Sequence, residues 1–268
     1  MPKQFDDQEE IFALVSNFNS DPSWVPTLFD RFLVLDQSDK VADWHSRWES
    51  DPNFRRSPHV GHNLLDYFTW IVDNWDVLPN WLLLAKGNMI PRHITHDDLL
   101  LVLEKRVFSP CYTKTEIVNA RSGFVDSMGM YQELNNNWYV PYKPHRYFTS
   151  IDAMGHFLFK NYISSPYVAF SPGGLWLLPR TQILNTDVAT FKALIEILNY
   201  GFFPAEAYMV ERLMGGIFSG TWELRAEWQN SEVLRERLKG MPDLKHKFVA
   251  KPGPLSPIKT IAAKLFGR

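Results

Sequence analysis

The sequence contains a single cysteine, Cys111, among its 268 residues. One thiol can form neither a disulfide within the chain nor a cysteine-based metal site, which is typical of a protein in a reducing compartment. No apolar run approaches the roughly 18 residues that a membrane-spanning helix needs. The polar and acidic N-terminus also lacks the pattern of a secretory signal. These absences predict a soluble, cytoplasmic protein.

A strong net charge is also missing, since the formal charge at pH 7 is −2, and we therefore expect no nucleic-acid partner. The glycine-rich phosphate loops and the Gly-x-Ser-x-Gly turn are absent. The spacing of His93 and His96 matches no standard zinc motif. The neighbouring Asp97 and Asp98 are explained by a helix that begins at Thr95, because a hydroxyl N-cap and acids in the first turn stabilise a helix end.

Aromatic residues, by contrast, are abundant, at 15% of the chain with 10 Trp. Aromatic side chains at this density either fill a core or line a carbohydrate site, where ring faces pack against the C–H faces of sugars. Basic residues gather at the C-terminal end of the sequence. The segment 251–268 forms a predicted basic amphipathic tail, which either rests on an anionic membrane surface or docks as a solvated tail.

Short apolar runs predict strands at Ile11–Ser16, Phe32–Leu35 and Trp81–Ala85. An amphipathic helix is predicted from Gly61 to Trp75 by its helical apolar stripe. Strands that alternate with helices in this way indicate an α/β fold with a mostly parallel central sheet. We expect one domain over residues 1–250. The remaining predicted elements are a helix from about Ser23, a loop at Pro52–Pro58, long loops over 109–147, a helix at Ile151–Tyr162, a strand at Leu175–Leu178, and helices at Phe191–Tyr200 and Ala205–Phe218.

Polar side chains follow each of the three predicted parallel strands. The carboxyl ends of neighbouring parallel strands meet at one crevice, where open α/β sheets bind ligands. Carboxylates suit ribose hydroxyls and base N–H groups, whereas lysine and arginine suit a diphosphate. The strand ends therefore predict a nucleotide-type ligand. The residues concerned are Asn19 and Asp21 after the first strand, Asp36 after the second, and Lys86, Asn88, Arg92 and His93 after the third.

The helix predicted at 205–218 carries two acids. Glu206 lies on the same face as Val210, a residue of the buried stripe. It is either a general base that faces a cleft or a first-turn acid that complements the helix dipole. Glu211 lies about 140° around the helix from it, so we expect a separate role. The adjacent Arg212 suggests a structural ion pair for Glu211.

Several motifs recur together in a known group of proteins, in the same order along the chain. The most specific block runs from Val60 to His93. Within about residues 12–220, the sequence resembles uncharacterised bacterial, fungal and viral proteins related to GT-A-type glycosyltransferases. The motifs are Asn17-Phe18-Asn19 with Asp21 and Trp24, Val60-Gly61-His62-Asn63, Asp66-Tyr67, Ile71–Pro79, Lys86-Gly87-Asn88, Pro91-Arg92-His93, His145–Phe148, Ser171–Gly174, Glu206-Ala207 and Glu211-Arg212.

The resemblance implies a GT-A-like fold that transfers a sugar from a nucleotide-sugar donor to the hydroxyl of a glycan or glycolipid acceptor. It implies that Glu206 is the base of an inverting reaction. The acceptor site would contain Gly173, Gly174 and Glu211. The donor site would contain Asn17, Asn19, Asp21, Asp36, Gly61, His62, Asn63, Lys86, Gly87, Asn88, Arg92 and His93.

One departure from the GT-A pattern concerns the metal. The usual Asp-x-Asp motif is expected after a central strand, where this chain has Lys86-Gly87-Asn88. A cation from Lys86 or Arg92 can instead neutralise a leaving diphosphate, although Mn²⁺ or Mg²⁺ binding stays open. The alternative function is a non-catalytic module that binds a nucleotide sugar or carbohydrate. Phosphoryl transfer is disfavoured because no Mg²⁺ ligands are evident.

Overall fold

A computed structural model describes residues 10–113, 124–126, 129–242 and 244. Its main sheet has six strands in the order β3-β2-β1-β4-β9-β5. Strand β1 pairs in parallel with β2 and β4, and β2 pairs in parallel with β3, whereas β9 runs antiparallel to β4 and β5. The expected α/β class with a largely parallel central sheet is thus confirmed. The strands are β1 (Ile11–Asn17), β2 (Phe32–Asp36), β3 (Phe54–Arg56), β4 (Trp81–Lys86), β5 (Ser109–Pro110) and β9 (Trp176–Pro179).

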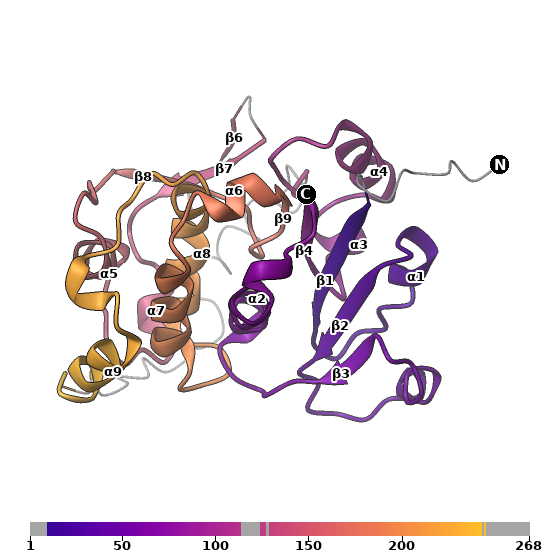
Figure 1. The fold of residues 1–268 in the computed structure, drawn as a ribbon, viewed down its shortest axis with the longest axis horizontal. Helices are drawn as coiled ribbons and strands as arrows, with labels where there is room; N and C mark the ends of the chain where they lie inside the picture. The colour runs from indigo at the N-terminus through magenta and orange to yellow at the C-terminus, as the bar shows by residue number, and fades with distance from the viewer. Residues whose placement is uncertain (1–9, 114–123, 127–128, 243, 245–268) are drawn as a thin grey trace, which may run out of the picture.

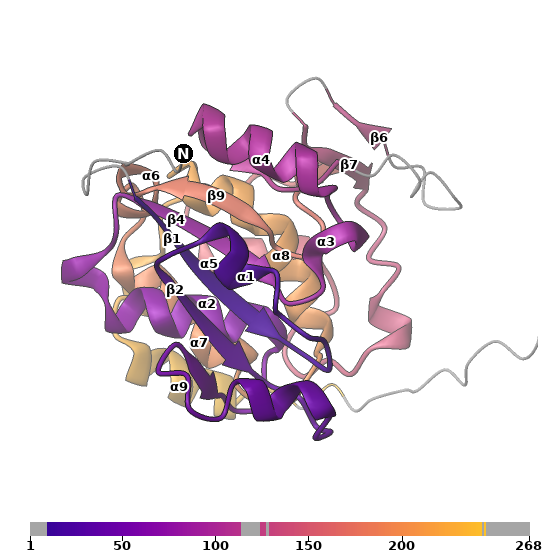
Figure 2. The same cartoon turned by 90° about the vertical axis from the view of Figure 1, so that its right-hand side faces the viewer.

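Helices cover both faces of this sheet, as Figures 1 and 2 show. Helix α2 lies on one face, with α7 and α8 packed beyond it, and α1 and α3 lie on the other face. The helices are α1 (Val25–Leu28), α2 (His62–Asp73), α3 (Met89–Arg92), α4 (His96–Lys105), α5 (Ile151–Leu158), α6 (Arg180–Leu184), α7 (Val188–Leu198), α8 (Ala205–Phe218) and α9 (Ser231–Lys239). Single helical turns are η2 (Asp43–Arg47), η3 (Trp75–Val77), η4 (Val140–Tyr142) and η5 (Ala226–Trp228).

The two-residue period of the strands explains this layering. In β1, Ala13 and Val15 pack with the cluster on the α1 side, and Leu14 packs with the cluster on the α2 side. Successive side chains of a strand point to opposite faces, so a strand that is apolar throughout is buried on both sides. Residues 82–85 of β4 are all buried. Strand β4 is therefore a central strand of the sheet.

A second, three-stranded antiparallel sheet joins β6 (Phe124–Val125), β7 (Tyr131–Leu134) and β8 (Tyr167–Phe170). Strand β8 packs against α8, on the far side of α2 from the main sheet. The sequence predicted only long loops with short elements over 109–147, because two- to four-residue strands are too short to show a period. Residues 114–123 and 127–128 of that region lie outside the described residues.

Most of the other predicted elements are present, with altered ends. Helix α8 has the predicted bounds, and Thr95 caps α4 by accepting a hydrogen bond from the Asp98 amide. The loop expected at Pro52–Pro58 is wrong in part, because β3 lies within it. The arginines of that short edge strand are exposed, so it has no apolar pattern to read.

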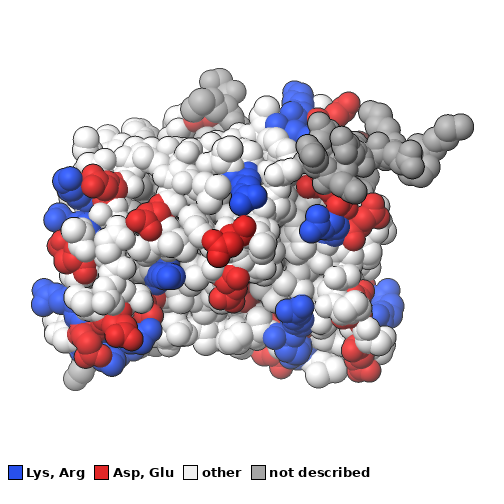
Figure 3. All heavy atoms as spheres, viewed as in Figure 1, with Lys and Arg blue, Asp and Glu red and all other residues white. Residues whose placement is uncertain are grey.

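None of the helices in the described part of the chain has both the length and the apolar character needed to cross a membrane. On the face shown in Figure 3, acidic and basic side chains are interspersed and form no large patch of one sign. The basic tail at 251–268 lies outside the described residues, so its amphipathic character stays a prediction.

Candidate functional site

The carboxyl ends of β1, β2 and β4 open onto a cavity of about 520 Å³. This is the crevice that the strand order predicts for an open α/β sheet. Helix α8 and the loops before it provide much of the remaining lining. The polar lining residues include Ser16, Asn17, Gln37, His62, Asn63, Lys86, Asn88, Arg92, His93, Glu133, Glu211 and Arg212, and the lining also includes Gly173.

Lys86, the last residue of β4, brings a positive charge into this cavity. Its ammonium group forms no hydrogen bond or ion pair with any described residue, and Arg92 likewise has none. Burial lowers the pKa of Lys86 to about 8, although the nearby Glu211 carboxylate partly opposes the shift. Taking a charged group out of water is costly unless an opposite charge compensates it. The arrangement therefore favours an anionic ligand.

Glu211, on α8, is the acid that reaches the cavity. Its Oε1 accepts a hydrogen bond from the Gly173 amide at 2.5 Å, and its Oε2 accepts one from Arg212 Nη1 at 3.1 Å. Burial raises the pKa of Glu211 above its ordinary value, against the opposing effects of Arg212 and Lys86. Because a carboxylate has about four acceptor positions, Glu211 keeps capacity for a further hydrogen bond to a ligand.

Gly173 connects Glu211 to α2. Its carbonyl accepts a hydrogen bond from Asn63 Nδ2 at 2.8 Å, while its amide donates to Glu211. The φ of Gly173 is +89°, a conformation that residues with a Cβ rarely adopt. The glycine pair that the sequence singled out thus positions the carboxylate through its backbone.

Arg212 forms ion pairs with two acids that line the cavity, Glu133 and Glu211. Its Nε donates to Glu133 Oε1 at 2.6 Å, and its guanidinium lies 4.2 Å from the Phe170 ring centre. Both Arg212 and Glu133 are buried. A buried ion pair costs desolvation but is strongly destabilising to break. The ion pair expected between Arg212 and Glu211 is present, and Glu133 is a second acid on the same arginine.

Four half-buried rings, Trp138, Phe202, Phe203 and Tyr208, form what we call the aromatic wall of the cavity. Phe203 stacks on Tyr208 with ring centres 4.8 Å apart, and its ring also stacks on His62 at 4.0 Å. Burial lowers the pKa of His62 well below its ordinary value. His62 is therefore a neutral member of this stack at pH 7.

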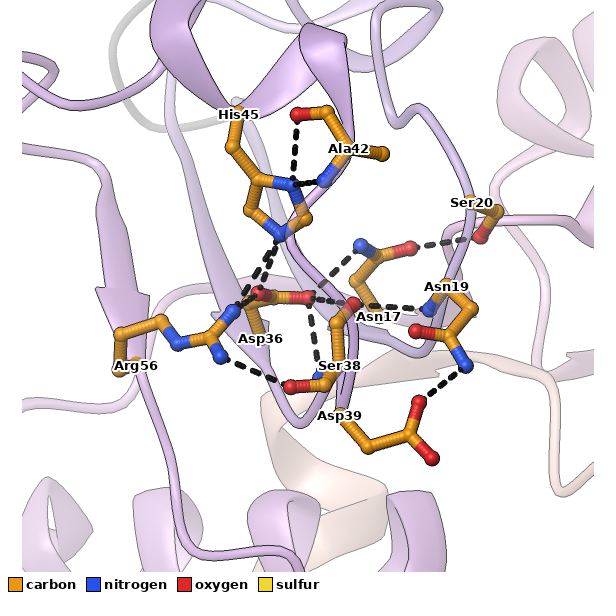
Figure 4. A network of polar contacts seen from close by, with 9 residues as sticks. All are labelled: Asn17, Asn19, Ser20, Asp36, Ser38, Asp39, Ala42, His45 and Arg56. Carbon is orange, nitrogen blue, oxygen red and sulfur yellow. Dashed lines mark hydrogen bonds and ion pairs between the residues drawn. The ribbon is translucent and has the colours of Figure 1, made fainter.

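Asp36 does not reach the cavity, contrary to the expectation that it contacts the donor. Figure 4 shows its carboxylate enclosed by side chains from four places in the chain. It accepts hydrogen bonds from Asn17 Nδ2 at 2.9 Å and Ser38 Oγ at 2.6 Å, contacts His45, and pairs with Arg56. Asp36 is fully buried and has partners on both oxygens. It positions Asn17, which does line the cavity.

Glu206 does not line the cavity, in contrast to the expectation that it faces a cleft as a base. Its side chain is fully buried and absent from the cavity lining. Its Oε1 accepts hydrogen bonds from three successive backbone amides, those of residues 146–148, at 2.9, 2.8 and 3.2 Å. Its Oε2 accepts one from the Tyr200 hydroxyl. With these four donors in place, Glu206 ties α8 to the 146–148 segment instead of meeting a substrate.

Two other predicted donor residues also lie off the cavity. The Asn19 amide group donates to Asp39 at 2.6 Å, and Asp21 pairs with Arg47. Neither residue is among those that line the cavity. Their polar side chains shape the loop after β1, which is the usual role of Asn and Asp in turns.

The remaining predicted glycines act through close packing. A Cβ on Gly87 would lie 1.9 Å from Asn17 Oδ1, and one on Gly174 would lie 2.8 Å from Leu64 Cδ2. Gly61 precedes α2 with a φ of +67°. None of the three lines the cavity, but each permits an approach that a larger residue would block.

The sequence analysis did not identify Gln37 and Ser16, which line the cavity. It also did not identify Asp66, which binds both of these side chains but does not itself line the cavity. Asp66 Oδ2 accepts hydrogen bonds from Ser16 Oγ at 2.5 Å and Gln37 Nε2 at 2.8 Å. Burial raises the pKa of Asp66 to about 7. A signal was present, because an acid between the buried Leu65 and Tyr67 needs a partner.

The residues at the end of β4 do not fit a divalent metal. Lys86 and Asn88 stand where an acidic pair would be needed, and no group of three His, Cys, Asp or Glu in the described part of the chain is placed to hold an ion. The acids of the cavity are paired with Arg212 instead.

Searches of protein families, curated proteins and solved structures found nothing that matches this chain. The relationship to GT-A-type enzymes therefore stays a prediction from the quoted motifs.

Proposed function

We propose that this protein is a glycosyltransferase that moves a sugar from a nucleotide-sugar donor to an acceptor hydroxyl. The observation that supports this most directly is the ammonium of Lys86, which has no ion-pair partner among the described residues and faces a cavity at the end of a central parallel strand. Together with Arg92, it supplies two positive charges for a ligand to neutralise. A nucleoside diphosphate carries the matching negative charge, and its phosphate oxygens are acceptors for both side chains.

The proximity of Glu211 to Lys86 favours group transfer over binding alone. Burial raises the pKa of this carboxyl, which makes it a better proton acceptor than an exposed glutamate. The cavity thus combines cations for a departing diphosphate with a base for an incoming hydroxyl. In this proposal Glu211 takes the role that the sequence assigned to Glu206.

The proposed reaction is a direct displacement with inversion. The acceptor oxygen forms a bond to the anomeric carbon as the bond from that carbon to the donor phosphate oxygen breaks. The electron pair of the broken bond leaves with the nucleoside diphosphate, which Lys86 and Arg92 stabilise. The acceptor proton passes to Glu211. No step needs a metal, in keeping with the residues at the end of β4.

Ligand-induced stabilisation tests the donor site. We expect UDP, GDP or ADP, or one of their sugar conjugates, to raise the melting temperature without added Mn²⁺, because a ligand that binds only the native state stabilises it by mass action. Lys86→Met should remove the shift. The proposal is wrong if no nucleotide stabilises the wild-type protein with or without Mn²⁺.

Glu211→Gln tests the base. Once a donor is identified, transfer or slow donor hydrolysis should fall by about 10² to 10⁴-fold, the usual contribution of a general base, while nucleotide affinity stays within a few fold. Glu236→Gln, at an exposed site on α9, is the matched control. Unchanged turnover in Glu211→Gln would remove Glu211 as the base.

A non-catalytic binding module is the second candidate. Arg212 donates a hydrogen bond to Glu211, which lowers the basicity of that carboxylate and favours a purely structural role for it. Calorimetric binding of a nucleotide sugar with no turnover of any bound donor would support the module.

A further inference from the structure

The cavity lining has two chemically different parts, which come from different elements of the fold. The strand ends and the loop after β4 supply amides and the two unpaired cations, Lys86 and Arg92. The aromatic wall comes from elsewhere, with Trp138 just before η4, Phe202 and Phe203 before α8, and Tyr208 on α8. Glu211 is three residues beyond Tyr208 on α8, so the carboxylate adjoins the wall.

The aromatic wall keeps part of its surface uncovered. Each of its four rings is only half-buried although it lies in a cavity. Trp138 meets Tyr208 edge to face with ring centres 5.7 Å apart, and Phe203 is stacked on Tyr208. The rings therefore brace one another in fixed orientations. Phe203 stacks on both His62 and Tyr208, and Tyr208 also stacks on Tyr139. The apolar ring surface of the wall that stays accessible, beside carboxylates, suits a ligand that has both C–H faces and hydroxyl groups, which is the chemistry of a pyranose ring.

The charged side chains beside the wall indicate whether its ligand is an acidic or a neutral sugar. Beside the aromatic wall, the two acids Glu133 and Glu211 share the single cation Arg212. Lys143 lies over the Phe203 ring at 4.2 Å from its centre, but it does not line the cavity. Lys86 lies near Glu211, but in the proposed reaction Lys86 and Arg92 are engaged by the donor diphosphate, so an acidic sugar at the wall would face an excess of carboxylate. A neutral sugar would not meet that repulsion.

We propose that the aromatic wall binds the terminal ring of a neutral saccharide, which presents one of its hydroxyl groups to Glu211. This inference rests on the proposed function in treating the saccharide as the acceptor. Saccharide binding at the wall can nevertheless be measured without turnover. The acceptor is thus identified as a carbohydrate, and acidic saccharides are disfavoured at this position.

The test uses neutral trisaccharides of glucose, mannose, galactose, xylose and N-acetylglucosamine, with trigalacturonate as the acidic probe. Binding to the full-length protein is measured by saturation-transfer NMR and tryptophan fluorescence, with and without UDP. We expect at least one neutral probe to bind and, in the presence of UDP, to bind about tenfold more tightly than trigalacturonate, a difference that corresponds to about 1.4 kcal/mol.

Substitutions in the aromatic wall test whether the saccharide binds there. Trp138→Ala and Phe202→Ala should each weaken the neutral saccharide about tenfold, since an aromatic contact contributes on the order of 1 kcal/mol. Phe202→Leu keeps an apolar side chain of similar size, so it tests ring stacking even if the alanine variants fold poorly. Phe124→Ala is the matched control, because Phe124 is an exposed ring outside the cavity lining.

The possible failures are distinguishable. If nucleotides stabilise the protein but no neutral trisaccharide binds with or without UDP, the inference is overturned and the donor site stands. If a neutral trisaccharide binds at the wall and no nucleotide binds, the saccharide site stands and the proposed transfer fails. Binding that survives both Trp138→Ala and Phe202→Leu, or that favours trigalacturonate, also overturns the inference.

Discussion

The two acids of α8 show how completely the surroundings decide what a single residue can do. Glu206 and Glu211 are five residues apart on one helix, where Glu206 is buried and Glu211 is half-buried. Glu206 has four hydrogen-bond donors around its two oxygens, whereas Glu211 has two and adjoins a cavity. Only the second carboxylate lines the cavity. Their spacing along the helix predicted that their roles differ but did not show which acid has which role.

At this scale we predict a pH-dependent affinity for UDP. The pKa of Lys86 is lowered to about 8 in the free protein, and a bound diphosphate would raise it. Above pH 8 the free protein must take up a proton to bind, so the affinity should fall with rising pH, by up to about tenfold per unit. Calorimetry at pH 7, 8 and 9 would measure the slope.

Lys86→Arg is the control for that experiment, because a guanidinium stays charged throughout this range. Its UDP affinity should change little between pH 7 and pH 9. Equal slopes in the wild type and Lys86→Arg would show that another group causes the pH dependence.

Among the elements, the N-terminal turn of α8 joins parts of the chain that are far apart in the sequence. Through Glu206 it is tied to the 146–148 segment, and through Tyr200 to the start of the loop that carries Phe202 and Phe203. These contacts hold the chain in place just before Phe202 and Phe203, two rings of the aromatic wall. Glu206, which the resemblance implied to be the catalytic base, thus connects the elements that shape the cavity.

Glu206→Gln should therefore reduce stability markedly. A glutamine side chain is neutral and has one acceptor oxygen, so it would turn an N–H₂ group either toward the three backbone amides or toward the Tyr200 hydroxyl. We expect a loss on the order of 3 kcal/mol in the free energy of unfolding, because buried donors are left unpaired.

Urea denaturation would measure this loss, with Glu236→Gln as the exposed control, for which we expect a change within about 0.5 kcal/mol. A Glu206→Gln protein as stable as the wild type would contradict the anchoring role.

In the molecule as a whole, Asp66 joins α2, on which it lies, to Ser16 of β1 in the main sheet, where its protonation affects global stability. It is 5% exposed, and its pKa is raised from 3.8 to about 7. Folding thus favours the protonated form. The stability it contributes is fully present below pH 3.8 and is lost as pH rises through 7, by up to about 4 kcal/mol for a shift of this size.

Asp66→Asn should remove that dependence. Relative to the wild type, the variant should gain free energy of unfolding between pH 5 and pH 8.5, as measured by urea denaturation at both values. Other carboxyl groups titrate alike in both proteins. Their effects on the free energy of unfolding therefore cancel in the difference between the variant and the wild type. A difference that stays constant with pH would refute this account of Asp66.

The layered core was largely predictable because it depends on local periodicity. The apolar runs of β1, β2 and β4 and the stripe of α2 appear directly in the sequence, and their order implies the parallel sheet. The small sheet of β6, β7 and β8 was not predictable, because its strands are short and it pairs residues as far apart as 131 and 170.

The sequence by itself determined the main strands, the principal helices and the crevice with Lys86 and Arg92 at its edge, since strand order and apolar spacing decide where polar strand ends meet. Only the tertiary structure decided that Asp36 and Glu206 are enclosed while Glu211 is not, and that rings at 138, 202, 203 and 208 form one wall. Hydrogen bonding and burial of a side chain depend on neighbours from distant parts of the chain, and no local pattern encodes those neighbours.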